Sequence, residues 1–357
     1  MERKPIDAVF EGGGVKGIAL VGAVSAIEND YEIIYHAGTS AGAIVAALLA
    51  AGYDAAGVKQ KINALDFNKI EDGSLIEKIP FVGPILDELS KMGLYKGDFF
   101  LKTMREYLAE RGVSTFRSFR RPEEELQGLT EGEKDRYRYK LQMVAADISR
   151  GCRLTLPQDI ADYEDEHGNT MKPENLEVAQ AVRMSMSIPF FFQPIKLKEK
   201  EGHKECLIVD GGLLSNFPVD LFDPKEKEPV RPTLGFKLSM DDPENHIKMA
   251  AVEHMIAGPI SELLALFWTA NEAPDRYYLK NADYIRTIFI DAHAIQSTNF
   301  ALTQQDKDNL FNYGLQAATI FMKGDANHPA FNYNAYMEMH RSGTPWPSRR
   351  EMVWRSY

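Results

Sequence analysis

Short apolar runs, glycine turns and helical stretches alternate at the start of the chain. Residues 6–10 form an apolar run that ends at three consecutive glycines, and a helix is expected over about 17–27. A second apolar run, 31–37, ends at Gly38 and precedes an alanine-rich helix over 41–51. Two strand–turn–helix units in succession predict an α/β layer architecture.

The rest of the chain continues this alternation less regularly. We expect further strands over 141–146, 207–209, 233–238 and 284–290, and helices over 99–108, 178–186 and 306–322, the last capped by Thr303. Residues 121–138 are dense in charge, which predicts an exposed loop or a solvated helix. Residues 75–95 mix apolar side chains with proline and glycine, which is compatible with a cap over a site or with a packed connection.

No internal repeat, low-complexity block or strong linker divides the 357 residues. The composition, 44% hydrophobic and 26% charged, is that of an ordinary globular protein, and a chain of this length can bury a large core. We therefore expect a single domain over 1–357, with a core over about 6–322. The tail over about 327–357 is rich in aromatic residues, which favours packing against the body of the protein.

Charge and targeting signals exclude several classes of protein. The net charge of −11 opposes non-specific binding to nucleic acid or to strongly anionic membranes, but not contact with a neutral lipid surface. The N-terminus lacks the apolar stretch of a signal peptide, and the longest run of small apolar residues, 42–52, is too short to span a bilayer. We expect a cytoplasmic protein with peripheral membrane contact, and a secretion route that needs no signal peptide stays open.

Metal and redox chemistry have no support in the sequence. The two cysteines, Cys152 and Cys206, form no C-x-x-C pair; a disulfide between them has no support, and two buried free thiols are expected. No His/Asp/Glu cluster has ligand spacing, and no calcium-loop pattern occurs. We therefore expect no metal and no cofactor.

The segment GTSAG follows the pattern G-x-S-x-G between an expected strand and an expected helix. A nucleophilic serine needs a sharp strand-to-helix turn, which Gly38 and Gly42 allow because glycine carries no Cβ. The helix that begins at Ala41 points its N-terminus at the site and favours developing negative charge. The pattern alone can occur by chance, but this context makes Ser40 a candidate nucleophile.

The segment GGGVKG lies between the first strand and the first helix and supplies Gly12, Gly13, Gly14, Lys16 and Gly17. Backbone N–H groups of such a loop can stabilise one oxyanion. The segment also satisfies the dinucleotide pattern G-x-G-x-x-G, but no acidic residue closes a second strand about twenty residues later, and no Walker A pattern occurs. An oxyanion hole is therefore favoured. Lys16 either steadies the loop, or adds positive potential near the anion, or is a solvated lysine beside a turn.

Asp210, Gly211 and Gly212 follow an expected strand. A buried strand that ends in a carboxylate delivers it to the carboxyl edge of the sheet, where α/β sites lie, although D-G-G alone is also a common turn. A serine nucleophile needs a general base. Of the eight histidines, His293 follows an expected strand, so the order Ser40–Asp210–His293 is compatible with a triad.

These three motifs, in this order, resemble the patatin-like phospholipase family over roughly residues 6–322. GGGVKG matches the family's oxyanion-hole motif, GTSAG its nucleophile elbow and DGG its aspartate motif. The stretches LQMVAAD over 141–147 and MSMSIP over 184–189 are similar to family segments as well. Asn216 and Pro218 follow DGG as they usually do in the family.

The resemblance implies a three-layer α/β/α fold with a mostly parallel central sheet, and a Ser40–Asp210 dyad without a histidine. It implies hydrolysis of glycerolipid acyl esters, of the phospholipase A or lysophospholipase type, without a metal. The implied partners are a phospholipid or lysophospholipid substrate and a membrane or micelle surface, and not nucleic acid. Two alternatives stay open: an acyltransferase that uses the same serine, and a catalytically idle scaffold, although neither dyad residue is damaged.

Overall fold

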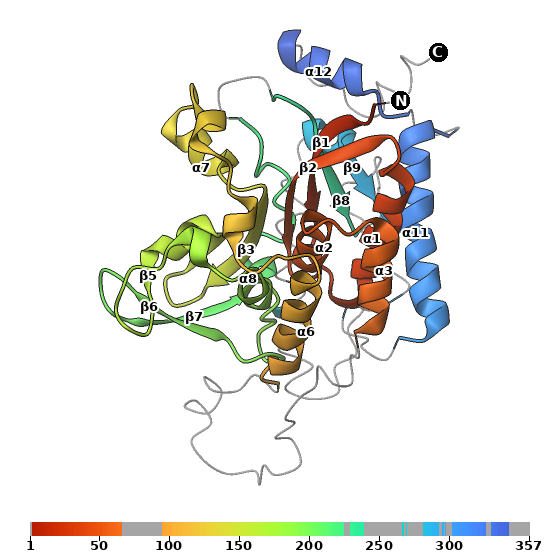
Figure 1. Cartoon of the computed structure of the whole chain (residues 1–357). Helices are drawn as coiled ribbons and strands as arrows, with labels where there is room; N and C mark the ends of the chain where they lie inside the picture. The colour runs from red at the N-terminus through yellow and green to blue at the C-terminus, as the bar shows by residue number, and fades with distance from the viewer. Residues whose placement is uncertain are drawn as a thin grey trace.

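The computed structural model describes residues 2–65, 95–224, 229–238, 266–267, 269, 281–292, 295, 297, 302–325 and 330–342. The strands within these residues are β1 (Lys4–Phe10), β2 (Tyr31–Thr39), β3 (Leu141–Asp147), β4 (Cys152–Leu156), β5 (Tyr163–Glu164), β6 (Ile195–Glu199), β7 (Glu205–Asp210), β8 (Thr233–Lys237) and β9 (Thr287–Phe289). They form one sheet in the order β5-β6-β7-β3-β2-β1-β8-β9, with β4 also paired to β3. Helices flank this sheet, so the fold is mixed α/β (Figure 1).

The sheet has a parallel part and an antiparallel extension. β3, β2, β1, β8 and β9 are parallel to one another, which confirms the expected parallel sheet. β4, β7, β6 and β5 add to β3 by antiparallel pairing, which the sequence analysis did not anticipate. Most residues of the parallel strands are buried, as expected for strands that are covered on both faces.

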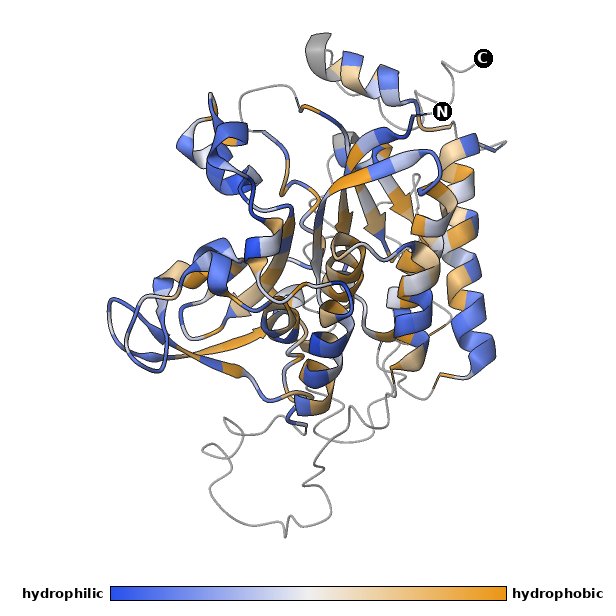
Figure 2. Ribbon diagram, viewed as in Figure 1, coloured by the Kyte–Doolittle hydropathy of each residue, from blue (hydrophilic) through white to orange (hydrophobic). Residues whose placement is uncertain are grey.

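The helices in the described residues are α1 (Gly17–Ile27), α2 (Ala41–Ala50), α3 (Ala55–Ala64), α6 (Asp98–Ala109), α7 (Glu131–Tyr137), α8 (Val178–Ser185), α10 (Asn281–Ile285), α11 (Gln304–Lys323) and α12 (Tyr333–Ser342). α1 and α2 are apolar on nearly every face and are therefore buried, whereas α7 has no buried residue. Figure 2 shows this contrast, with the central strands and α2 largely hydrophobic and α7 largely hydrophilic. The exposed charged segment expected over 121–138 is confirmed.

Two hydrophobic clusters cover the two faces of the sheet, and a third joins α10 to α12. The larger cluster joins the sheet to α1, α2, α3, α8 and α11. The smaller one, on the opposite face, consists of Val9, Tyr35, Ala37 and Phe222. No helix in the described ranges is long and apolar enough to cross a membrane.

Several expected elements need correction. The strand expected over 284–290 is wrong in its first part, because Tyr284 and Ile285 end α10 and β9 is confined to Thr287–Phe289. α3, β4 and β6 were not expected, since each has too few periodic apolar positions to stand out. Both cysteines are free, but only Cys206 is buried. The segment 75–95 lies outside the described residues apart from its last residue.

The tail agrees with the expected packing as far as it is described. Tyr336 of α12 is buried against Ile285 and Met337. The Tyr333 hydroxyl donates a hydrogen bond to the backbone oxygen of Pro5 (3.2 Å). α12 is therefore joined to the start of β1. Residues 343–357, with both tail tryptophans, lie outside the described residues.

α1 and α11 approach each other backbone to backbone through two glycines. A Cβ at Gly314 would lie 1.8 Å from the backbone oxygen of Ala19, and one at Gly22 would lie 1.9 Å from that of Phe311. Gly314→Ala should therefore lower the free energy of unfolding by about 1–3 kcal/mol, because the helices must separate. Urea unfolding monitored by circular dichroism measures this change.

The matched control is Gly132→Ala in α7, where a Cβ would meet no atom within 4 Å. There alanine should raise the free energy of unfolding, by up to about 1 kcal/mol, through its higher helix propensity. If both substitutions changed stability in the same direction, the close packing of α1 on α11 would be contradicted.

Candidate active site

Two strands share one edge of β3 and run toward each other. β2 pairs in parallel with the first half of β3, up to Thr39 beside Val144. β7 pairs antiparallel with the second half, as far as Asp210 beside Ala145. β4 occupies the other edge of β3 along both stretches, so β2 and β7 lie end to end on the same edge. The end of each strand therefore brings Ser40 and Asp210 together.

Asp210 thus reaches the site by a route that differs from the expected one. A parallel strand would have delivered the carboxylate to the carboxyl edge of the sheet directly. β7 instead arrives from the opposite direction and stops halfway along β3, where β2 ends. The Asp210 carboxylate lies at the carboxyl ends of β1 and β2 only because β7 ends at the point on β3 where β2 also ends.

Ser40 lies in a sharp turn between β2 and α2. Its backbone angles, φ 54° and ψ −122°, fall in a region that non-glycine residues rarely adopt, and its side chain is 2% exposed. A Cβ at Gly42 would lie 2.2 Å from the backbone oxygen of Phe10, and one at Gly38 would lie 2.4 Å from the backbone of Gly42. The two glycines therefore let the turn press against the end of β1, as a nucleophile elbow requires.

Asp210 is an unusual carboxyl group because it is fully buried. Burial raises its pKa to about 7, although the Ser40 hydroxyl and the Gly212 N–H both act to lower it. Oδ1 accepts the Gly212 N–H at 2.8 Å. Oδ2 and the Ser40 Oγ are both buried, near each other, and neither completes a hydrogen bond within the described residues. Hydrogen bonds of catalytic groups commonly tighten only when substrate is bound.

Two backbone donors of the glycine loop have no acceptor within the part of the chain that the structure describes. The Gly12 N–H donates to the backbone oxygen of Asn216 (3.2 Å), and the Lys16 N–H donates to that of Gly13 (3.2 Å). The N–H groups of Gly13 and Gly14 have no hydrogen-bond partner among the described residues. Gly14 has a positive φ of 57°, and a Cβ there would lie 2.2 Å from the Ser297 backbone oxygen, so only glycine fits.

The remaining two members of the glycine loop, Gly17 and Lys16, are packed inside the protein. The Gly17 N–H bonds to the Gly14 oxygen, and a Cβ at Gly17 would lie 3.2 Å from that of Ala41. Gly17 therefore lets α1 start close to α2. Lys16 is only 5% exposed, so its interpretation as a solvated lysine is wrong.

Hydrogen bonds join the three motifs to one another. Gly12 and Asn216 exchange two hydrogen bonds. The Gly12 N–H donates to the backbone oxygen of Asn216, and the Asn216 Nδ2 donates to the Gly12 oxygen at 3.1 Å. The Thr39 hydroxyl donates to the backbone oxygen of Ser215 at 3.0 Å. The segment after the aspartate motif thus holds both the glycine loop and the elbow. Asn216 was expected only as a family feature, because its bridging position depends on tertiary contacts that leave no signal in the sequence.

An apolar pocket opens beside the elbow. Its empty space, including the open mouth, is about 550 Å³. Gly14 and Ala41 border it next to Ser40, and the rest of its lining is apolar. That lining comprises Val15, Gly17, Ile18, Ile44, Ile62, Leu65, Phe100, Met186, Ile188 and Phe192. A ligand in this pocket would contact hydrocarbon almost throughout, close to the serine.

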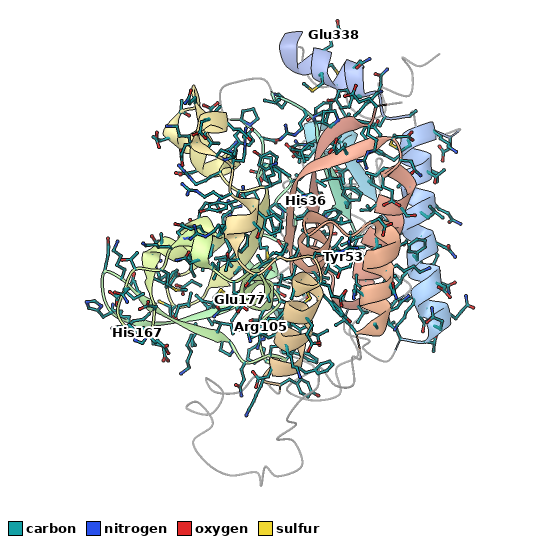
Figure 3. The ribbon with its side chains drawn as sticks, in the orientation of Figure 1. His36, Tyr53, Arg105, His167, Glu177 and Glu338 are labelled. Carbon is teal, nitrogen blue, oxygen red and sulfur yellow. The ribbon has the colours of Figure 1, made fainter. Side chains whose placement is uncertain are left out.

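Three histidines have described side chains, and none of them is placed to act on Ser40. His36 lies four residues earlier on β2, about 13 Å away by strand rise, and burial lowers its pKa to about 4. His167 and His203 are exposed, and Figure 3 shows His167 at the periphery and His36 in the sheet. His293 lies outside the described residues. No group of three metal-binding side chains occurs in the part of the chain that the structure describes.

Sequence comparison identifies relatives over most of the chain. The model of the family described as "Patatin-like phospholipase" matches residues 8–223, which include all three motifs. The uncharacterized protein YqhO of Bacillus subtilis is 35% identical over 323 residues, which cover 89% of this chain and 98% of YqhO. The uncharacterized protein R571 of Acanthamoeba polyphaga mimivirus is 25% identical over 313 residues, 86% of this chain and 90% of R571.

Structural comparison finds two bacterial proteins at low sequence identity. VipD from Legionella pneumophila aligns with a TM-score of 0.45 and 19% identity, over 89% of this chain and 66% of VipD. The type III effector ExoU of Pseudomonas aeruginosa aligns with a TM-score of 0.39 and 17% identity, over 88% of this chain and 52% of ExoU. This chain therefore spans less than two thirds of the length of either solved protein.

The raised pKa of Asp210 predicts a specific pH dependence of stability. Between its ordinary value of 3.8 and about 7, the folded protein holds a proton on Asp210 that the unfolded chain has released. The contribution of Asp210 to stability therefore falls as pH rises through this interval. Asp210→Asn removes the titration, so the variant should gain stability relative to the wild type between pH 4 and pH 8, by at most about 4 kcal/mol.

Denaturant unfolding of both proteins across this pH range measures the difference. Asp220→Asn, which changes an exposed carboxyl group ten residues away in the chain, is the control and should follow the wild-type profile. Parallel profiles for Asp210→Asn and the wild type would contradict the burial argument.

Proposed function

The chain belongs to the patatin-like phospholipase family, and we propose that it is a serine acyl hydrolase that cleaves glycerolipid acyl esters through a Ser40–Asp210 dyad. The observation that carries this proposal is the meeting of β2 and β7 on one edge of β3. It supports the dyad because it puts a serine in a strained elbow next to a carboxyl group whose pKa is raised to about 7. An aspartate with its ordinary pKa would be a weak base at neutral pH.

The first half of the reaction forms an acyl-enzyme. Asp210 accepts the proton of the Ser40 hydroxyl as Oγ attacks the ester carbonyl carbon. The carbonyl oxygen becomes an oxyanion, which the N–H groups of Gly13 and Gly14, together with that of Ala41, stabilise. The C–O bond to the alcohol then breaks, Asp210 returns the proton to the leaving oxygen, and the lysolipid or glycerol product departs.

The second half restores the serine. A water molecule gives a proton to Asp210 and attacks the acyl carbon, and the same backbone donors stabilise the second oxyanion. The bond to Oγ breaks, Ser40 recovers the proton from Asp210, and the fatty acid leaves. No metal and no cofactor takes part in this scheme.

The apolar pocket supports a lipid substrate. Two of the proposed oxyanion donors, Gly14 and Ala41, border it, and its lining is almost entirely hydrocarbon. An acyl chain placed there would bury apolar surface at about 25 cal/mol per Å², while the polar alcohol part of the ester faces outward. A phospholipase A or lysophospholipase activity at a membrane or micelle surface fits this arrangement. We propose that the whole chain, 1–357, forms the single domain that carries this activity.

The dyad is tested by substitution in a lipid digestion assay. Ser40→Ala and Asp210→Asn should each lower the release of fatty acid and lysolipid about 10³-fold or more, because each removes one member of a unit. The double variant should be no worse than either single variant. Mass spectrometry of the digested lipid extract gives both products.

His293→Ala is the control and should retain most activity, because the proposed base is Asp210. An inactive His293→Ala variant would show that the enzyme has a histidine base and that the dyad assignment is wrong. Addition of a short alcohol separates hydrolysis from acyl transfer: a main product that contains the alcohol would indicate an acyltransferase. If the wild-type protein turned over no lipid ester, we would conclude that it is a catalytically idle scaffold.

A further inference from the structure

One buried hydroxyl fills the seam between the ends of β2 and β7. Ser185, the last residue of α8, is fully buried. Its Oγ accepts the backbone N–H of Ser40 at 2.9 Å and donates to the backbone oxygen of Val144 at 2.6 Å. A single side chain thus links the nucleophile to the strand on which both site-bearing strands pair.

The ladder of β2 ends one residue before the nucleophile. Thr39 is the last residue paired with β3, so the N–H of Ser40 has no strand partner at the turn. Buried backbone donors are almost always paired, and leaving one unpaired is costly. Ser40 also adopts a disfavoured backbone conformation, which persists only where surrounding contacts fix it. The Ser185 hydroxyl supplies such a contact at the strained residue itself.

The same short segment also holds the other half of the dyad. The backbone N–H of Asp210 donates to the backbone oxygen of Ser187 at 2.8 Å. The guanidinium of Arg183 donates to the Ser187 hydroxyl (2.5 Å) and to the backbone oxygens of Lys96 (2.7 Å) and Gln193 (2.9 Å). The end of α8 is therefore anchored, and it binds one backbone N–H from each dyad residue.

We propose that Ser185 is a positioning residue that aims the Ser40 hydroxyl at the ester carbon and at Asp210. This inference rests on the proposed function, and it adds a residue that touches neither the substrate nor the reacting atoms. Because Ser185 takes the N–H of Ser40, that N–H is not an oxyanion donor. The hydroxyl of Ser185 acts by orienting Ser40. Its loss therefore affects the chemical step and leaves substrate binding in the apolar pocket intact.

The test compares Ser185→Ala with the wild-type protein in two assays. The kcat of lipid ester hydrolysis should fall about 10²-fold, as expected for a small misplacement of a reacting group, with KM within about twofold. The rate of labelling of Ser40 by a fluorophosphonate should fall by a similar factor. Ser185→Thr keeps the hydroxyl and should recover most of the labelling rate.

The matched control deletes an equally buried hydroxyl elsewhere. Thr287 in β9 is 1% exposed, and its hydroxyl donates to the backbone oxygen of Asp283 at 2.5 Å. Thr287→Val should leave the labelling rate and kcat at wild-type values, even where it lowers the melting temperature. If the labelling rate and kcat fell as far in Thr287→Val as in Ser185→Ala, the effect of Ser185 would be one of general stability. That result would overturn the proposal.

Ser185→Cys keeps the proposal testable if Ser185→Ala does not fold. A thiol keeps a side-chain group at this position but is a weak hydrogen-bonding group, so the labelling rate should fall as for alanine. Wild-type labelling by either folded variant, or a folded Ser185→Thr no faster than Ser185→Ala, would overturn the role of Ser185. Failure of the wild-type protein itself to label would instead overturn the proposed function, and this inference with it.

Discussion

The edge of β3 is shared by two strands that approach from opposite directions, and the arrangement of the site depends on this. β2 occupies the first half of that edge and β7 the second, so their ends meet between Val144 and Ala145. Had β7 continued by one more residue, that residue would have taken the place beside Val144 that Thr39 of β2 occupies. The chain must therefore leave the sheet at both ends of the seam. One exit is the elbow at Ser40, and the other is the glycine turn after Asp210.

The lack of space at this seam explains the glycines around it. A Cβ at Gly211 would lie 2.2 Å from the backbone oxygen of Val144, and one at Gly12 would lie 3.1 Å from the Cβ of Ser40. A Cβ is excluded at Gly12 and Gly211, and the Asp210 carboxyl group beside them is buried. Exclusion of water is what raises the pKa of Asp210, since a buried carboxylate loses its hydration. The same packing thus raises the pKa of Asp210, the proposed base, to about 7, and the contribution of Asp210 to stability falls as pH rises from 3.8 to about 7.

The sequence predicted the local parts of the site better than their assembly. The elbow at Ser40 and the glycine loop each depend on neighbouring residues, so their positions after β2 and β1 could be expected from the pattern alone. The antiparallel course of β7 could not, because strand direction depends on pairing between residues more than sixty positions apart. The burial of Lys16 and the bond from Ser40 to Ser185 also arise only from tertiary packing. For the same reason α3, β4 and β6, whose apolar residues are few, were not expected.

The most direct test of the account is the pH dependence of the fluorophosphonate labelling rate of Ser40 in the wild-type protein and in Asp210→Asn. If Asp210 is the base, the wild-type rate should rise with pH through an apparent pKa near 7 and then level off. The Asp210→Asn rate should be low and should lack this transition. A wild-type rate that does not change between pH 5 and pH 9, or a transition near pH 7 that survives in Asp210→Asn, would contradict the central claim that the buried aspartate activates the serine.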